Sequence, residues 1–131
     1  MTNNKARVLV VDDEPVVRMS YERSLAAEFD AHSAPDGEQA LREMKREPAD
    51  VVLLDLRLPG ARGLEVLEAM KRQWPETEVV VITGYPSVDS AKQAVRLGAA
   101  DYLAKPVGPN EVTSAARTAL LRKQWTLRIS H

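Results

Sequence analysis

The stretch Val8-Leu-Val-Val-Asp-Asp-Glu14 places a short run of valine and leucine directly before three acidic residues. An apolar run of this length, without alternating polar residues, is typical of a strand buried on both faces of a parallel sheet. Two later runs, Val51–Leu54 and Val79–Ile82, have the same character. The three runs therefore predict the central strands of one parallel sheet.

Stretches with helical periodicity lie between these runs and after them. Apolar residues recur at helical spacing at Leu64, Leu67 and Met70, and a longer pattern of the same kind runs from Val112 to Leu120. Each pattern puts its apolar residues on one stripe of a helix. We therefore expect helices that cover the sheet with one face and meet solvent with the other.

Turn and cap residues divide the chain into alternating strands and helices. Two weaker strands, 31–34 and 101–104, complete an alternation that repeats five times. Because parallel crossovers are right-handed, this order predicts a doubly wound α/β sheet with helices on both faces. The expected helix ends are marked by Asp36 and Ser87 as N-caps, Gly98 as a C-terminal stop, and Pro109 in a first turn.

Composition narrows the class of protein. The 131 residues suit one domain, and 18 basic against 19 acidic residues give a net charge of −1, which favours neither direct nucleic-acid binding nor membrane attachment. The absence of cysteine excludes disulfides, zinc–thiolate sites and thiol nucleophiles. Residues 1–7 are polar, and every apolar run is too short to span a membrane. We expect a soluble, cytoplasmic protein.

The last fifteen residues, Arg117–His131, are basic and amphipathic. We expect them to extend the final helix past the core. The predicted domain therefore covers residues 1–121, and residues 122–131 form a helix extension or linker stump.

Polar residues gather at the carboxyl ends of the predicted strands. Asp12 and Asp13 follow the first strand, Asp55 the third, Thr83 ends the fourth, and Lys105 follows the fifth. In an open parallel sheet this edge is where ligands bind. The sequence therefore predicts a single site built from these five side chains.

Three carboxylates in one cleft repel each other unless they share a cation. Oxygen-only ligands, without nearby histidine or cysteine, favour Mg²⁺, with Mn²⁺ as a substitute. A carboxylate facing such an ion can attack phosphorus, because the ion and a lysine ammonium offset charge on the phosphoryl oxygens. Thr83 and Lys105 are placed to hold those oxygens.

Four strings, in order, resemble the receiver domains of bacterial two-component response regulators. They are V-L-V-V-D-D-E at 8–14, L-L-D-L-R-L-P-G at 53–60, V-I-T-G at 81–84 and D-Y-L-A-K-P at 101–106. The resemblance covers nearly the whole chain. It implies a flavodoxin-like (βα)5 three-layer sandwich whose five parallel strands have the order 2-1-3-4-5.

The resemblance also implies roles for the acidic residues. Asp55 is the expected phosphoacceptor, and Asp12 and Asp13 are the acidic pair, with Asp13 a direct ligand of the metal. Arg57 is expected to bind the metal through its backbone carbonyl.

The remaining site residues follow from the same resemblance. Lys105 is expected to bind the phosphoryl group, and Thr83 and Tyr102 to act as the switch. The bond between Lys105 and Pro106 is expected to be cis, which proline adopts at modest cost.

The function implied is that of a signalling switch. A sensor histidine kinase or a small phosphodonor would phosphorylate Asp55, and the change would reach the surface formed by the helix from Val88 to Leu97, the fifth strand and the final helix. That surface could mediate homodimerisation, and the output would be transcriptional. The domain would catalyse only its own phosphoryl transfer and dephosphorylation.

Two other functions compete with this reading. An aspartyl-nucleophile phosphatase would share the sheet and Mg²⁺, but it needs a second aspartate two residues after the first, where this chain has Asp13 followed by Glu14 and Pro15. A flavodoxin-like cofactor binder would need a phosphate-cradling loop after the first strand, and an acidic loop there repels phosphate.

Overall fold

A computed structural model of the chain describes residues 5–58 and 63–129, without the side chains of residues 126, 128 and 129. Five parallel strands form one sheet in the order β2-β1-β3-β4-β5. Both the parallel arrangement and the strand order that we expected are confirmed. The strands are β1 (Arg7–Val11), β2 (Asp30–Ala34), β3 (Val51–Leu54), β4 (Glu78–Thr83) and β5 (Asp101–Ala104).

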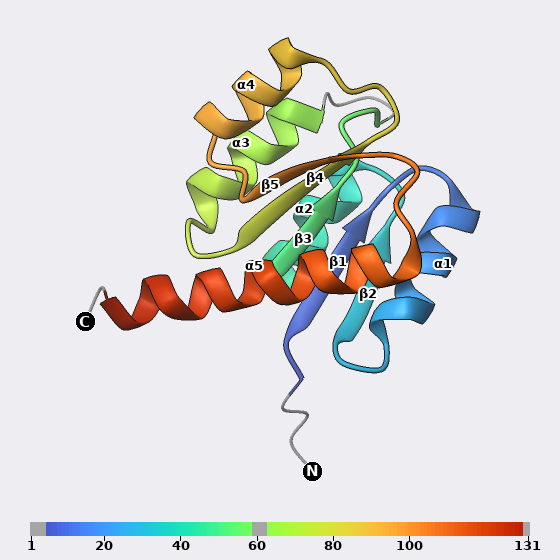
Figure 1. The fold of residues 1–131 in the computed structure, drawn as a ribbon. Coiled ribbons are helices and arrows are strands. Elements are labelled where there is room, and N and C mark those ends of the chain that lie inside the picture. Colours follow the sequence, from blue (N-terminus) through green and yellow to red (C-terminus); the bar gives the residue numbers. More distant parts are fainter. Residues whose placement is uncertain (1–4, 59–62, 130–131) are drawn as a thin grey trace.

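Helices cover both faces of the sheet and make the fold three-layered (Figure 1). Side chains of α1 and α5 pack with Val8, Val10 and Leu53 on one face. Side chains of α2, α3 and α4 pack with Leu9 and Val52 on the other. Because β1, β3 and β4 are buried on both faces, their sequences show unbroken apolar runs. The helices are α1 (Pro15–Leu25), α2 (Gly37–Arg46), α3 (Gly63–Gln73), α4 (Val88–Arg96) and α5 (Pro109–Ile129).

The expected caps fix where α2 and α4 begin. The Asp36 carboxylate accepts a hydrogen bond from the Gln39 N–H at 2.8 Å, and the Ser87 hydroxyl accepts one from the Ser90 N–H at 3.0 Å. Gly98 follows α4 with φ +96°, a left-handed conformation that favours glycine.

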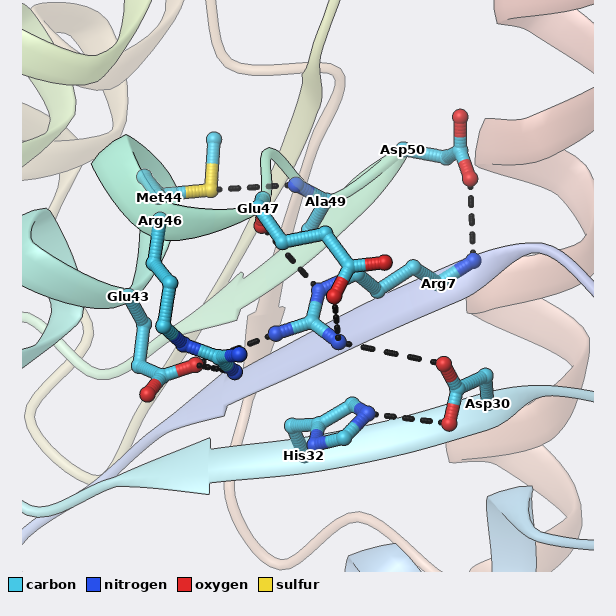
Figure 2. A network of polar contacts seen from close by, with 9 residues as sticks. All are labelled: Arg7, Asp30, His32, Glu43, Met44, Arg46, Glu47, Ala49 and Asp50. Carbon is cyan, nitrogen blue, oxygen red and sulfur yellow. Dashed lines mark hydrogen bonds and ion pairs between the residues drawn. The ribbon is translucent and has the colours of Figure 1, made fainter.

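A cluster of ionic contacts holds the edge of the sheet opposite the predicted site (Figure 2). The Arg7 guanidinium is almost fully buried and lies 3.0 Å from the Glu43 carboxylate, 3.4 Å from that of Glu47 and 3.8 Å from that of Asp30. Its Nε also donates to the Glu47 carbonyl at 3.1 Å. One β1 side chain thus joins β2 and the end of α2, and its several partners offset the cost of burying its charge.

The final helix runs past this same edge of the sheet (Figure 1). Lys123 Nζ lies 2.7 Å from Asp50 Oδ1, and Asp50 Oδ2 accepts the Arg7 backbone N–H at 2.9 Å. Arg122 donates to the carbonyl of Ala100 at 3.2 Å. The helix therefore has polar contacts with the domain as far as Lys123, while Trp125 is 63% exposed.

Candidate functional site

The carboxyl ends of the four adjacent strands β1, β3, β4 and β5 bring the predicted side chains to one edge of the sheet. Strand pairing sets Val11 beside Leu54, so that the residues after them, Asp12 and Asp55, leave the sheet side by side. Carboxylate oxygens of Asp12, Asp13 and Asp55 lie within 4.8 Å of one another. Asp12 and Asp55 are buried, whereas Asp13 is exposed. Three acidic groups thus surround one point at the rim of the sheet.

Backbone N–H groups orient two of these carboxylates. Asp12 Oδ1 accepts from the Glu14 N–H at 2.9 Å, and Asp55 Oδ1 accepts from the Arg57 N–H at 2.9 Å. Each aspartate therefore uses one oxygen to shape the loop after its own strand. The second oxygen of each is left to face the other groups of the site.

Lys105 bridges the two buried carboxylates. Its ammonium lies 2.7 Å from Asp12 Oδ2 and 3.0 Å from Asp55 Oδ2, and its side chain is 17% exposed. Glu14 is a further acidic neighbour at 4.0 Å, which the sequence interpretation did not assign to the site. The peptide bond that follows, between Lys105 and Pro106, is cis. The lysine partly offsets the charge of the acidic group.

A pocket of about 420 Å³ opens beside Asp55 and Lys105. On its rim the Arg57 guanidinium lies over the Tyr85 ring, with 3.9 Å between the guanidinium carbon and the ring centroid. Tyr85 is 68% exposed and was not among the predicted residues. In the sequence, the one feature that could have indicated a place for Tyr85 at the site is its position two residues after Thr83. The pocket lies next to the buried Asp55 carboxylate and is lined by Asp13, Arg57, Tyr85 and Lys105 among others.

The model of the response regulator receiver domain family matches residues 8–117 of this chain. The chain belongs to this family. It is 38% identical over 118 residues to the response regulator protein PilR of Pseudomonas aeruginosa, and this match covers 89% of the chain and 26% of PilR. The family membership that the sequence motifs indicated is thereby confirmed.

Two other similarities agree with the family. The alginate biosynthesis transcriptional regulatory protein AlgB of Pseudomonas syringae is 37% identical, over 98% of this chain and 29% of AlgB. The crystal structure of a CheY-like receiver domain protein from Methanospirillum hungatei is 26% identical with a TM-score of 0.90, covering 94% of this chain and 99% of that one. This chain thus spans less than a third of the length of PilR and of AlgB.

The two predicted switch residues of the receiver domain lie on neighbouring strands, β4 and β5. Thr83 is buried, and its hydroxyl accepts the Tyr85 N–H at 3.1 Å. The Tyr102 hydroxyl lies 2.6 Å from the Ser90 hydroxyl and accepts the Ser87 N–H at 3.2 Å. Tyr102 is therefore tied to the first turn of α4. The sequence marked Ser87 only as a helix cap and gave no sign of this contact.

Burial and charge shift the pKa values of the two central groups of the receiver domain. Burial raises the pKa of Asp55 above its usual value, although the hydrogen bonds from Arg57 and Lys105 act in the opposite direction. Burial alone would lower the pKa of Lys105, but its hydrogen bonds to Asp12 and Asp55 raise it well above the usual value. Lys105 therefore stays protonated, and ionised Asp55 is held at a cost in folding free energy.

Asp55→Asn is expected to raise the melting temperature of the receiver domain at pH 7 to 8 in the presence of a chelator. Because the folded-state pKa of Asp55 is raised, its ionisation opposes folding as the pH rises through that pKa. Below the pKa that Asp55 has in the unfolded chain, its carboxyl is neutral in both the folded and the unfolded state. The difference in melting temperature between Asp55→Asn and the wild type should therefore shrink toward acidic pH. Thermal melts across this range measure the effect.

Asp50→Asn serves as the matched control for these melts. Asp50 lies at the opposite end of β3 and is paired with Lys123, so its replacement should lower the melting temperature. A lower melting temperature for Asp55→Asn than for the wild type at neutral pH would contradict the account.

Proposed function

We propose that this receiver domain accepts a phosphoryl group on Asp55 in a reaction that depends on Mg²⁺. The observation that carries the proposal is the Lys105 ammonium held between Asp12 and Asp55, with Asp13 in the same cluster. A buried carboxylate next to a fixed cation and two further carboxylates has the groups that in-line phosphoryl transfer requires.

The acidic cluster fits a magnesium ion by the chemistry of its donors. All three side chains offer oxygen, which is the ligand that Mg²⁺ prefers, and Asp13 is open to solvent, so bound water can remain. Asp12, Asp13, Asp55 and the backbone carbonyl of Arg57 would hold the ion, and Mn²⁺ could replace it. When bound, the ion would offset negative charge on the phosphoryl oxygens.

Three residues of the chain have separate roles in the proposed transfer. An oxygen of the Asp55 carboxylate forms the new bond to phosphorus, while the bond from phosphorus to the donor breaks and the leaving group keeps its electrons. Lys105, already within 3.0 Å of Asp55, would donate hydrogen bonds to the phosphoryl oxygens. Thr83, at the end of the adjacent strand, would donate its hydroxyl to the product.

Mixing the protein with acetyl phosphate and Mg²⁺ should add one phosphoryl group, detected by intact-mass measurement. Asp55→Asn should add none, and chelation of Mg²⁺ should suppress uptake by the wild type. Asp50→Asn is the matched control, because it removes a carboxylate at the other end of the same strand and should be phosphorylated like the wild type. Equal labelling of Asp55→Asn and wild type would remove the basis of the proposal.

We further propose that a sensor histidine kinase is the physiological donor and that the domain catalyses only its own phosphoryl transfer and dephosphorylation. The name of AlgB, a transcriptional regulatory protein, supports a transcriptional output. The cytoplasm is the compartment that we propose for this output. The surface formed by α4, β5 and α5 would transmit the signal and could pair two copies of the domain. In the described residues, no helix is both long and apolar enough to cross a membrane.

The last part of α5 is proposed to connect this domain to the rest of a longer regulator. The receiver domain would end at residue 121, and residues 122–131 would form the helical extension. The exposed Leu121 and Trp125 support a boundary in this region, because both leave the packed core. The contacts of Arg122 and Lys123 would fix the direction in which the extension leaves the domain.

A further inference from the structure

The start of α3 lies against the backbone of the loop that follows Asp55. A Cβ atom on Gly63 would stand 2.3 Å from the Cα of Leu56, 2.6 Å from its carbonyl oxygen and 2.7 Å from its carbonyl carbon. All three are backbone atoms, so no side-chain rotation can relieve the overlap. Any residue other than glycine at this position must push α3 away from Leu56 or displace Leu56 itself.

The contact involves the one peptide group that links Leu56 to Arg57. The Leu56 carbonyl accepts a hydrogen bond from the Gly63 N–H at 3.1 Å. The N–H of the same peptide group, contributed by Arg57, donates to Asp55 Oδ1 at 2.9 Å. The peptide group is thus held at both ends, by the first residue of α3 and by the proposed phosphoacceptor.

We propose that Gly63 is a positioning residue for the metal site, acting through the Leu56–Arg57 peptide group. Its lack of a side chain lets α3 rest on Leu56, and the resulting hydrogen bond sets the plane of this peptide. That plane directs the Arg57 N–H to Asp55 and places the Cα of Arg57, the atom from which the proposed carbonyl ligand extends. The inference rests on the proposed function, because it concerns the same magnesium site.

The proposal predicts a selective loss of metal affinity in Gly63→Ala. Mg²⁺ requires nearly ideal octahedral ligand geometry, whereas Ca²⁺ tolerates irregular arrangements. A shifted peptide group keeps all the carboxylates but misplaces Asp55 and the Arg57 carbonyl. We expect the dissociation constant for Mg²⁺ to rise about tenfold or more, and that for Ca²⁺ to rise by a smaller factor.

The experiment is an NMR titration of the full chain with Mg²⁺ alone and then with Ca²⁺ alone, following the amide signals of residues near Asp55. The same spectra show whether Gly63→Ala is folded. Gly98→Ala is the matched control, because its left-handed φ of +96° makes alanine costly there too, but at the end of α4 instead of beside Asp55. Its Mg²⁺ affinity should equal that of the wild type.

The possible results separate the role of Gly63 from the proposed Mg²⁺-dependent function. Wild-type affinity for Mg²⁺ in a folded Gly63→Ala, or an equal loss in Gly98→Ala, would overturn the inference and leave the proposed function standing. A wild type that binds no Mg²⁺ would overturn both. If Gly63→Ala does not fold, Arg57→Pro removes the N–H at the other end of the same peptide group. That variant should show the same Mg²⁺-selective loss, and unchanged affinity in it would overturn the inference.

Discussion

Lys105→Ala should accept a phosphoryl group from acetyl phosphate about 10² to 10³ times more slowly than the wild type, the usual loss when one fixed donor to a developing anion is removed. The ammonium bridges Asp12 and Asp55, so it lies where phosphoryl oxygens would arrive on the proposed acceptor Asp55. Binding of Mg²⁺ should persist, because all three carboxylates remain. The initial rate of uptake, followed by intact mass at saturating Mg²⁺, measures the effect.

Lys71→Ala is the matched control for this variant. Lys71 is also partly buried, but its ammonium donates to the carbonyls of Pro75 and Thr77, each at 2.8 Å, at the far end of α3. The Lys71→Ala variant should be phosphorylated at the wild-type rate. If Lys105→Ala takes up phosphate as fast as Lys71→Ala, Lys105 has no part in the transfer.

Thr83→Val should accept a phosphoryl group on Asp55 but transmit little of the resulting conformational change to α4. Valine keeps the volume and branching of threonine and lacks the hydroxyl that would turn toward the phosphoryl group. In the wild type that movement would leave space behind Thr83, favour an inward position of the Tyr102 ring and break its contacts with Ser87 and Ser90. Loss of this coupling corresponds to about 1–3 kcal/mol. Phosphorylation of Thr83→Val should therefore shift the equilibrium between the outward and inward positions of Tyr102 by a roughly 5- to 150-fold smaller factor than in the wild type.

The NMR signals of Ser87, Ser90 and Tyr102 report this coupling directly. In phosphorylated wild type they should move, whereas in phosphorylated Thr83→Val they should stay near their unphosphorylated positions. Thr83→Ser restores a hydroxyl and should recover the response. Signals that respond equally in Thr83→Val and wild type would show that the path does not run through Thr83.

The central strands, and the clustering of the candidate site residues at their ends, could be predicted from short stretches of sequence. Strands buried on both faces need unbroken apolar runs, and such runs identified β1, β3 and β4. The parallel topology then places the ends of these strands at one edge, so Asp12 and Asp55 could be brought together from the sequence. Caps such as Asp36 follow from the short-range geometry of a helix start.

Contacts set by tertiary packing could not be predicted in the same way. The approach of Gly63 to Leu56 depends on how α3 settles on the loop after β3, and a glycine in a sequence gives no sign of it. The bond between Tyr102 and Ser90 joins β5 to α4 across twelve residues of chain. The stacking of Arg57 on Tyr85 likewise joins two loops that only the fold brings together.

The most direct test of the account is to locate the phosphoryl group. After incubation with acetyl phosphate and Mg²⁺, borohydride reduces an aspartyl phosphate to homoserine, and peptide mass spectrometry identifies the converted residue. The account predicts homoserine at position 55, with conversion that disappears when Mg²⁺ is chelated. Conversion at Asp12 or Asp13 instead, or a phosphoryl group on a residue outside this cluster, would contradict it.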